Sequence, residues 1–294
     1  MSPRRNARAL VPPPKRYPAS GKTRALGQHF LRDDAVSERI VSLVAPTSRD
    51  LVLEIGPGQG ALTGHLARAA GRLLAIEVDA GLAATLMERF ADATHVEIRM
   101  ADARSFDYAG LPALKPDPSG RVLIIGNLPY SVGKPILMAL VEAGTAIDEM
   151  ALMLQKEVAE RVAALPGGRT YGSLTVLTQL GCEAHLAFTV PPGAFRPPPQ
   201  VDSAVLHLRV RPEPRVAVPE TPRFREVVLA AFGQRRKNLA NALAAGLGLS
   251  PDSARALCTA AAVDPGRRAE TLSFDEFARL AISASRHRPR RSHT

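Results

Sequence analysis

Cysteine is scarce in this sequence, and long apolar runs are missing from it. The chain of 294 residues has two cysteines, Cys182 and Cys258, and no tryptophan. Two cysteines cannot form a disulfide framework or a multi-cysteine metal site, and they favour a reducing, cytoplasmic compartment. No stretch approaches the roughly 20 apolar residues of a membrane-spanning helix, and the N-terminus lacks the apolar segment of a secretory signal. We therefore expect a cytoplasmic protein.

Acidic residues are absent from both ends of the chain. Residues 1–24 carry seven Lys or Arg and residues 286–294 carry four Arg, with no acid in either segment. The net charge of +10 therefore resides in these ends, and the part between them is close to neutral. Basic ends of this kind indicate a polyanionic partner such as nucleic acid. The alternative is a pair of solubilising tails.

The central part of the chain alternates between strand and helix patterns. Short apolar runs occupy 51–55, 73–76, 96–100, 122–125 and 150–154, and helical spacing occupies 35–44, 61–70, 80–91, 132–143 and 156–164. This alternation predicts an α/β fold, with a parallel sheet covered by helices on both faces. A further helix is expected at 172–180, and segments 185–190 and 204–210 are expected to form a final antiparallel pair.

The composition changes near residue 212. Four prolines lie between Pro212 and Pro222, which suits a stiff linker. Four short helices and no strand are expected beyond it, and Ser273 with Glu276 forms a capping box at the start of the last helix. The predicted parts are a basic arm (1–24), a catalytic domain (25–212), a helical domain (213–285) and a basic tail (286–294).

A glycine-rich loop follows the first predicted strand of the sheet. The segment Glu54-Ile55-Gly56-Pro57-Gly58-Gln59-Gly60 lets the backbone turn sharply and approach a ligand. The glycine spacing departs from the dinucleotide fingerprint, and an acid at Glu54 is unfavourable beside a pyrophosphate. An acid at this position suits a ligand that carries positive charge. The loop therefore favours S-adenosylmethionine over NAD, with a purely structural turn as the remaining alternative.

Two acids follow the next two predicted strands. Glu77 ends the second strand, where a carboxylate can accept hydrogen bonds from both ribose hydroxyls of an adenosyl group. Asp79 is the better cap for the following helix, which leaves Glu77 for the ribose. Asp102 follows the third strand and can accept a hydrogen bond from an adenine amino group. Together with the glycine loop, these acids form an ordered series along the edge of the sheet.

The segment Asn127-Leu128-Pro129-Tyr130 follows the fourth strand and carries the most specific chemistry. The lone pair of the adenine N6 amine is delocalised into the ring, so the amine is a poor nucleophile. The side-chain oxygen of Asn127 and the backbone carbonyl of Leu128 can hold its two hydrogens, while Tyr130 stacks on the base. This is catalysis by positioning and electrostatic stabilisation, with no strong base required.

A proline-rich segment, Phe195-Arg196-Pro197-Pro198-Pro199, separates the last two predicted strands. Prolines keep such a loop rigid. Phe195 on this loop could form the second face of a base sandwich, because a base held outside its stack needs aromatic contacts. The alternative is a buried phenylalanine in a proline-rich connection.

Taken in order, these segments resemble the ribosomal RNA adenine N6-dimethyltransferases. The resemblance covers about residues 22–282, and its most specific segments are Gly27-Gln28-His29-Phe30-Leu31 and Asn127-Leu128-Pro129-Tyr130, supported by the glycine loop, Glu77-Val78-Asp79, Asp102, and Phe195 through Ser203. It implies a Rossmann-like class I S-adenosylmethionine-dependent methyltransferase sheet with an antiparallel last strand and a small all-α C-terminal domain. It also implies S-adenosylmethionine as the methyl donor. The seven histidines show no metal-ligand spacing, so no metal is expected.

The family pattern also assigns roles to individual residues. Those implied to contact the methyl donor are His29, Leu31, Gly56, Gly58, Glu77, Asp102 and Asn127. Those implied to act on the target adenosine are Asn127, Leu128, Tyr130 and Phe195. Arg235, Arg236 and Lys237, in a segment resembling part of the family's helical domain, are candidates for rRNA phosphate contacts.

The implied substrate is a pair of adjacent adenosines near the 3′ end of small-subunit rRNA, each receiving two methyl groups within a pre-ribosomal particle. We expect no membrane partner and a monomer. The alternatives are a dimethyltransferase of large-subunit rRNA that confers antibiotic resistance, and a non-catalytic assembly or transcription factor on the same fold. An NAD-dependent oxidoreductase is disfavoured by the glycine spacing and by the Asn127 segment.

Overall fold

The computed structural model describes residues 29–218, 221–234 and 236–286. The predicted basic arm and residues 287–294 of the predicted tail lie outside the described residues. By internal contacts the chain divides into two compact units. The first unit contains the chain up to residue 159 together with 184–210, and the second contains 160–183 together with the chain from 211 onward.

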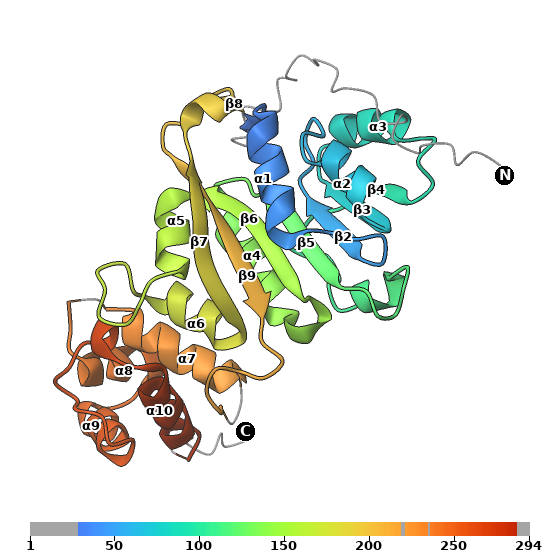
Figure 1. The fold of residues 1–294 in the computed structure, drawn as a ribbon. Coiled ribbons are helices and arrows are strands. Elements are labelled where there is room, and N and C mark those ends of the chain that lie inside the picture. Colours follow the sequence, from blue (N-terminus) through green and yellow to red (C-terminus); the bar gives the residue numbers. More distant parts are fainter. Residues whose placement is uncertain (1–28, 219–220, 235, 287–294) are drawn as a thin grey trace. The chain divides into compact units, whose positions relative to one another are not determined.

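The first unit is built on a seven-stranded sheet with the order β4-β3-β2-β5-β6-β9-β7 (Figure 1). The strands are β2 (Leu51–Ile55), β3 (Arg72–Glu77), β4 (Val96–Met100), β5 (Val122–Asn127), β6 (Glu149–Gln155), β7 (Cys182–Val190) and β9 (Ser203–Val210). Strands β2 to β6 pair in parallel, whereas β9 pairs antiparallel with β6. The predicted α/β fold with antiparallel strands at the end of the sheet is confirmed.

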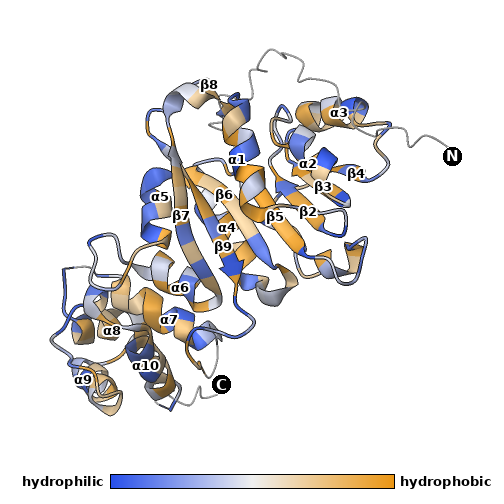
Figure 2. Ribbon diagram, in the orientation of Figure 1, coloured by the Kyte–Doolittle hydropathy of each residue, from blue (hydrophilic) through white to orange (hydrophobic). Residues whose placement is uncertain are grey.

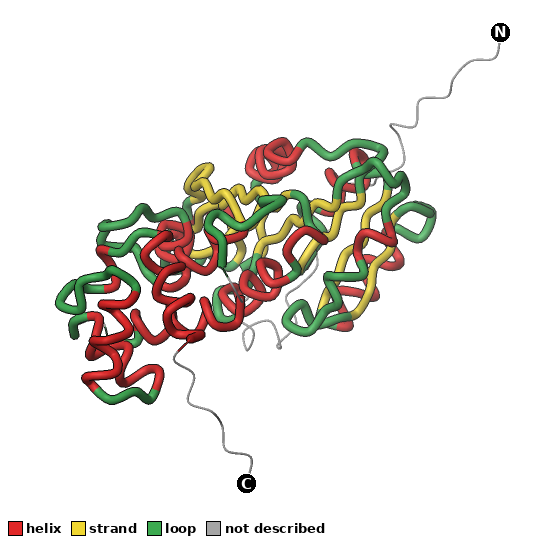
Figure 3. The backbone as a smooth tube through the Cα atoms, turned by 90° about the horizontal axis from the view of Figure 1, so that it is seen from below, coloured by secondary structure: helices red, strands yellow, loops and turns green. Residues whose placement is uncertain are grey.

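Continuous apolar segments make up most of each central strand because both faces of the sheet are covered, and Glu54 is a buried acid within β2. Val52 packs with helices on one face, and its neighbours Leu51 and Leu53, which point to the other face, are equally buried. Such continuous apolar strands are typical of parallel sheets with helices on both sides. Figure 2 shows these strands as the most hydrophobic part of the unit, and Figure 3 shows helices on both faces of the sheet.

The helices of this region follow the predicted pattern closely. They are α1 (Asp34–Val44), α2 (Thr63–Ala69), α3 (Ala80–Arg89), α4 (Gly133–Glu142) and α5 (Lys156–Val162). Asp79 caps α3 as expected, since its carboxylate accepts from the backbone amides of Gly81 and Leu82. The strand order reverses between β2 and β5, and ligands of α/β proteins bind at such a switch point.

A second, two-stranded sheet was not expected from the sequence. Strand β1 (Phe30–Leu31) pairs antiparallel with β8 (Phe195–Arg196), so that Phe30 lies opposite Arg196 and Leu31 lies opposite Phe195. The backbone amide of Arg32 extends this ladder by donating to the carbonyl of Ala194 at 2.8 Å. The pairing joins the first described residues to the proline-rich segment.

The second unit is helical. It contains α6 (Ser173–Gly181), α7 (Thr221–Phe232), α8 (Leu239–Leu247), α9 (Pro251–Ala260) and α10 (Phe274–Arg286). The expected capping box forms at the start of α10, since the Ser273 amide donates to Glu276 and the Glu276 amide donates to Ser273. No helix in the described part of the chain is long and apolar enough to cross a membrane.

Residues 160–183 belong to the helical unit by their contacts, whereas the predicted domain boundary at 212/213 places them in the catalytic domain. Tyr171 and Val176 are fully buried in the helical core, and the Tyr171 hydroxyl donates to the carbonyl of Leu272 at 3.1 Å. A division by composition along the chain could not detect a segment whose partners lie about 100 residues later.

Candidate functional site

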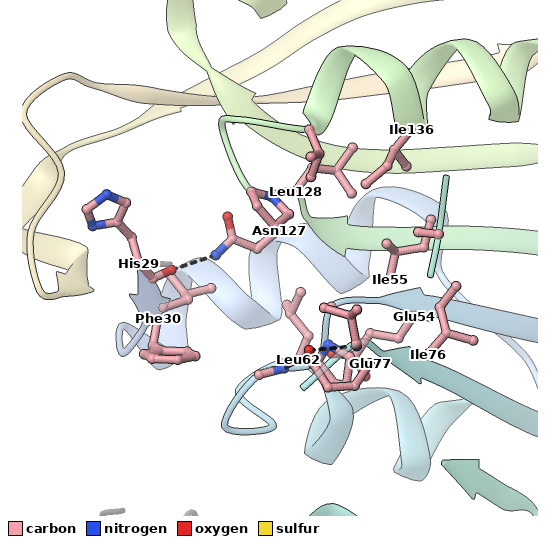
Figure 4. Close-up of a pocket in the computed structure, with 18 of the residues that line it drawn as sticks. His29, Phe30, Glu54, Ile55, Leu62, Ile76, Glu77, Asn127, Leu128 and Ile136 are labelled. Carbon is pink, nitrogen blue, oxygen red and sulfur yellow. Dashed lines mark hydrogen bonds between the residues drawn. The ribbon is translucent and has the colours of Figure 1, made fainter. Parts of the chain in front are cut away.

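A pocket opens at the carboxyl ends of β2, β3, β4 and β5, within the first unit (Figure 4). Its walls come from β1, from the loop after β2, and from the segments that follow the other three strands. The lining includes nearly all of the residues predicted to hold the donor or the target base: His29, Leu31, Gly56, Gly58, Glu77, Asp102, Asn127, Leu128 and Tyr130. The topology therefore brings together residues that lie about 100 positions apart in the sequence.

The glycine loop takes a backbone course that other residues would adopt only with strain. Gly56, Gly58 and Gly60 have φ angles of +66°, +56° and +81°. A Cβ on Gly58 would lie 2.9 Å from the Phe30 ring, which is closer than real Cβ atoms approach their neighbours. The loop and β1 can therefore lie this close together only because residue 58 is glycine, and Gly56 and Gly58 both line the pocket.

Glu77 is fixed by three backbone amides. Its carboxylate accepts from Gly58 at 3.1 Å, from Val78 at 2.9 Å and from Asp79 at 3.0 Å. Burial raises the pKa of Glu77, and these three hydrogen bonds oppose that rise. The side chain therefore ties the glycine loop to the end of β3 and keeps a defined acceptor at the pocket wall.

Glu54 is the second buried acid of the pocket. It is 1% exposed, and its Oε2 atom has no hydrogen-bond partner among the described residues. Burial raises the pKa of this carboxyl to about 8. A buried, unpartnered carboxyl oxygen in a cleft is a common sign of a ligand site.

Asp102 lies at the mouth of the pocket and is paired with a neighbour. The Arg104 guanidinium donates from Nε to both carboxylate oxygens at 3.1 Å and from Nη2 to Oδ2 at 2.6 Å. This contact holds the pKa of Asp102 below its usual range, so the carboxylate is an ionised acceptor. The next turn is fixed by the buried Tyr108, whose hydroxyl donates to the carbonyl of Ala103 at 2.6 Å.

Asn127 ends β5 and is held from the opposite wall. Its side-chain nitrogen donates to the backbone carbonyl of His29 at 3.0 Å (Figure 4). Because a carbonyl can only accept, the nitrogen must face it, and Oδ1 remains as an acceptor for another donor. His29 is itself fixed, since its Nδ1 lies 2.8 Å from the carbonyl of Pro197.

Tyr130 presents the aromatic surface of this wall. Its ring is half-buried and lies 5.5 Å from the His29 ring, centroid to centroid. Its hydroxyl shares a 2.6 Å hydrogen bond with the hydroxyl of Ser203, at the start of β9. The wall of the pocket around Tyr130 is therefore stabilised by contacts with His29, which precedes β1, and with Ser203 of β9.

The structure does not bring Phe195 to the pocket. The residue is 1% exposed and packs into the core with Leu31, Phe188 and Val190, and it does not line the cavity. Its place in β8, opposite Leu31, turns the ring toward that core. A stacking role would require the ring to leave the core, so the structure does not support the role expected from the sequence.

The predicted rRNA contacts belong to the second unit. Arg236 and Lys237 are exposed in the turn before α8, and the Lys237 amide donates to the carbonyl of Gln234 at 2.9 Å. Arg235 lies outside the described residues. In the described part of the chain, no cluster of three or more His, Cys, Asp or Glu residues is placed to hold a metal ion.

The pocket residues fit S-adenosylmethionine. Glu77 and Asp102 supply carboxylate acceptors of the kind that ribose hydroxyls and an adenine amine require, and Gly56 and Gly58 line the same pocket. The unpartnered oxygen of Glu54 suits a cation. A dinucleotide pyrophosphate would face this acid, so the donor set agrees better with a sulfonium ligand than with NAD.

Comparison with protein families identifies the chain. A family model described as ribosomal RNA adenine dimethylase matches residues 19–285. The chain belongs to the ribosomal RNA adenine dimethylase family. The family predicted from the Gly27 and Asn127 segments is thus confirmed, and with it a methyltransferase rather than an oxidoreductase fold.

Curated relatives of this family cover nearly the whole chain. A protein from Chromohalobacter salexigens is 43% identical over 92% of this chain and 94% of its own length, and one from Xanthomonas axonopodis pv. citri is 45% identical over 88% and 94%. A protein from Geobacter metallireducens is 43% identical over 88% and 94%. Each is named ribosomal RNA small subunit methyltransferase A.

Solved structures of related methyltransferases share the fold. The 23S rRNA methyltransferase ErmE is 27% identical with a TM-score of 0.64, covering 87% of this chain and 99% of its own. A dimethyladenosine transferase from Plasmodium falciparum has a TM-score of 0.71 over 88% of this chain and 98% of its own, at 23% identity. The class I methyltransferase fold with a helical C-terminal region is therefore established for this family member.

Some pocket residues carried no signal that sequence reasoning used. Phe30 belongs to the Gly27–Leu31 motif, which does not reveal that its ring packs against the glycine loop at Gly58. Ser203 and Arg104 reach the site through partners, Tyr130 and Asp102, that the fold brings near them. Ser203 and Arg104 therefore affect the site only through their hydrogen bonds to Tyr130 and Asp102, and a short sequence motif does not show which residue will pair with it.

Proposed function

We propose that this protein transfers methyl groups from S-adenosylmethionine to N6 of two adjacent adenosines near the 3′ end of small-subunit (16S) rRNA, producing N6,N6-dimethyladenosine. The observation that carries this proposal is the arrangement of Asn127. Its amide nitrogen is held by His29, which leaves Oδ1 as an acceptor in a pocket whose other wall suits the donor.

The donor half of the pocket has acceptors of the required kind. Glu77 is suited to the ribose hydroxyls and Asp102 to the adenine amine, while the backbone at Gly56 and Gly58 can approach the methionine part. Leu31 adds an apolar contact from β1. When bound, the donor supplies a methyl group on a positively charged sulfur.

On the acceptor side, the chain has to orient a weakly nucleophilic amine. Oδ1 of Asn127 and the carbonyl of Leu128 accept from the two N6 hydrogens, which directs the lone pair toward the methyl group. The same acceptors stabilise the positive charge that develops on the amine as the bond forms. Tyr130, braced by Ser203, offers its ring to the base.

The small-subunit substrate is favoured over the large-subunit alternative by the relatives. Proteins named for the small subunit are 43–45% identical to this chain, whereas the solved 23S enzyme is 27% identical. Arg236 and Lys237 in the helical unit, with Arg235, are the proposed phosphate contacts. We further propose that the substrate is a pre-ribosomal particle, and that the protein acts in the cytoplasm as a monomer.

The test uses small ribosomal subunits from cells that lack this methylation. The subunits are incubated with the purified protein and S-adenosylmethionine, and the digested rRNA is analysed by mass spectrometry. We expect N6,N6-dimethyladenosine at two adjacent positions near the 3′ end. Modification of large-subunit RNA instead would favour the resistance-type alternative. Bound donor without any modification would favour a non-catalytic assembly factor.

A further inference from the structure

Three carboxyl groups line the pocket, and they differ in how their charge is stabilised. Asp102 is paired with Arg104, and Glu77 accepts from three backbone amides. The Oε2 atom of Glu54 is fully buried and has no hydrogen-bond partner among the described residues. A buried carboxylate with an unsatisfied oxygen is costly, so Glu54 is the acid of this pocket whose charge depends most on a bound ligand.

The protein groups around Glu54 do not by themselves compensate the cost of burying its negative charge. Thr63 faces it from α2, Glu77 from β3 and Arg89 from α3. Glu77 repels the charge, while Arg89 and Thr63 favour it. Burial outweighs both favourable contributions, and the net effect raises the pKa of Glu54 to about 8. At neutral pH the protein groups alone therefore keep this carboxyl mainly in its neutral form.

The methyl donor and its product differ in one charge. S-adenosylmethionine carries a positive sulfonium in addition to its amino and carboxylate groups. S-adenosylhomocysteine, which remains after methyl transfer, has a neutral thioether at the same position. A positive charge within about 4–6 Å of a buried carboxyl favours its ionised form, whereas a neutral sulfur does not.

We propose that Glu54 senses the charge of the donor: it loses its proton when S-adenosylmethionine binds and keeps it when S-adenosylhomocysteine binds. This inference rests on the proposed methyl donor. Donor binding releases the Glu54 proton to solvent, and after methyl transfer the carboxylate takes one proton back from solvent. The spent product then lies beside a neutral carboxyl, which weakens its attraction and favours its exchange for fresh donor.

The inference predicts a pH dependence that differs between the two ligands. Binding of S-adenosylmethionine should strengthen as pH rises from 6 toward 8, by up to about tenfold per pH unit, and then level off. Binding of S-adenosylhomocysteine should change much less over this interval. The preference for donor over product should therefore increase with pH up to the pKa of the free carboxyl.

Calorimetry with the full chain measures the proton directly. Each ligand is titrated at pH 7.0 in two buffers of different ionisation enthalpy, and the difference in heat gives the protons released. Because the protein groups set the pKa of Glu54 to about 8, S-adenosylmethionine should release up to roughly 0.9 proton more than S-adenosylhomocysteine. At pH 9 this difference should nearly vanish.

The Glu54→Gln variant is the matched control, because glutamine resembles the neutral acid in shape and polarity. It should lose the difference in proton release and bind S-adenosylmethionine at least tenfold more weakly, with little change for S-adenosylhomocysteine. Protons lost by the ligand's own amino group would persist in this variant. Equal proton release for both ligands in the wild-type protein would overturn the inference without any variant. An unchanged difference in proton release in Glu54→Gln would also overturn it. Failure of both ligands to bind would overturn the proposed methyl donor itself.

Discussion

A single methyl group added at Gly58 should disable the donor side of the pocket. Gly58 has φ +56°, and a Cβ there would lie 2.9 Å and 3.1 Å from Cδ1 and Cε1 of the Phe30 ring. The ring is 7% exposed and forms part of the pocket wall, so it has little room to move away. The amide of Gly58 also donates to Glu77, which links the loop to the proposed ribose site.

The cost of Gly58→Ala has two parts. Placing alanine in the left-handed region costs about 1–2 kcal/mol. Moving Phe30 out of an overpacked contact costs a further 1–3 kcal/mol, roughly. The backbone cost lowers the stability of the fold at any position with this conformation. The cost of moving Phe30 changes the wall of the pocket and therefore lowers the affinity for the donor. If this second part of about 1–3 kcal/mol is lost from binding, the affinity for S-adenosylmethionine falls roughly 5- to 150-fold.

Gly144 provides a matched control for the backbone part. Its φ is +55°, and a Cβ there would have no neighbour within 4 Å. Gly144→Ala should lower the midpoint of thermal unfolding, measured by circular dichroism, as the backbone strain in Gly58→Ala also does. Its affinity for the methyl donor, measured by calorimetry, should be unchanged. Wild-type affinity in Gly58→Ala, or an equal loss in Gly144→Ala, would refute the steric argument.

Three further results are expected. Asn127→Ala should reduce methyl transfer at least about 100-fold while changing donor affinity far less, as judged by calorimetry beside the rRNA assay; wild-type turnover would contradict the role of Asn127. Reversing the charge of Arg236 and Lys237 should weaken binding to the ribosomal particle and lower its salt slope by about one per lost phosphate contact, whereas an unchanged slope would point to another surface. Burial raises the pKa of Glu54 from 4.5 to about 8, so the folded form binds more protons than the unfolded chain between these values, and stability falls as pH rises through this interval. Glu54→Gln should remove this loss, up to about 3 kcal/mol at pH 7, in thermal unfolding from pH 5 to 8; a wild-type slope in the variant would contradict it.

Features with a local signal could be predicted from the sequence. The strand at 51–55 is an apolar run interrupted only by Glu54, and Asp79 is a capping residue at the start of a helical pattern. The acids Glu77 and Asp102 could be placed at strand ends because parallel strands finish at the same edge of a sheet. These signals were sufficient to predict that the residues expected to contact the methyl donor lie in one pocket.

Features that depend on distant pairing could not be predicted in this way. Strands β1 and β8 have two residues each, too short for any periodicity, and they meet across about 165 positions. The burial of Phe195 follows from that pairing, so its motif suggested a stacking ring where the fold has a core residue. The bond from Asn127 to His29 joins a side chain to a backbone carbonyl, which no residue pattern records.

The grouping of residues 160–183 with the helical unit has a consequence for exchanging parts between family members. A transplant of the segment after residue 212 would leave Tyr171, Val176 and Leu180 behind with the recipient. These side chains belong to the helical core, so the incoming helices would meet foreign partners there. Exchange of the helical unit by recombination therefore needs two pieces of sequence to be inherited together. A single crossover between residues 183 and 211 would separate these pieces, whereas one before residue 160 would carry them over together with strands β7 and β9 of the sheet.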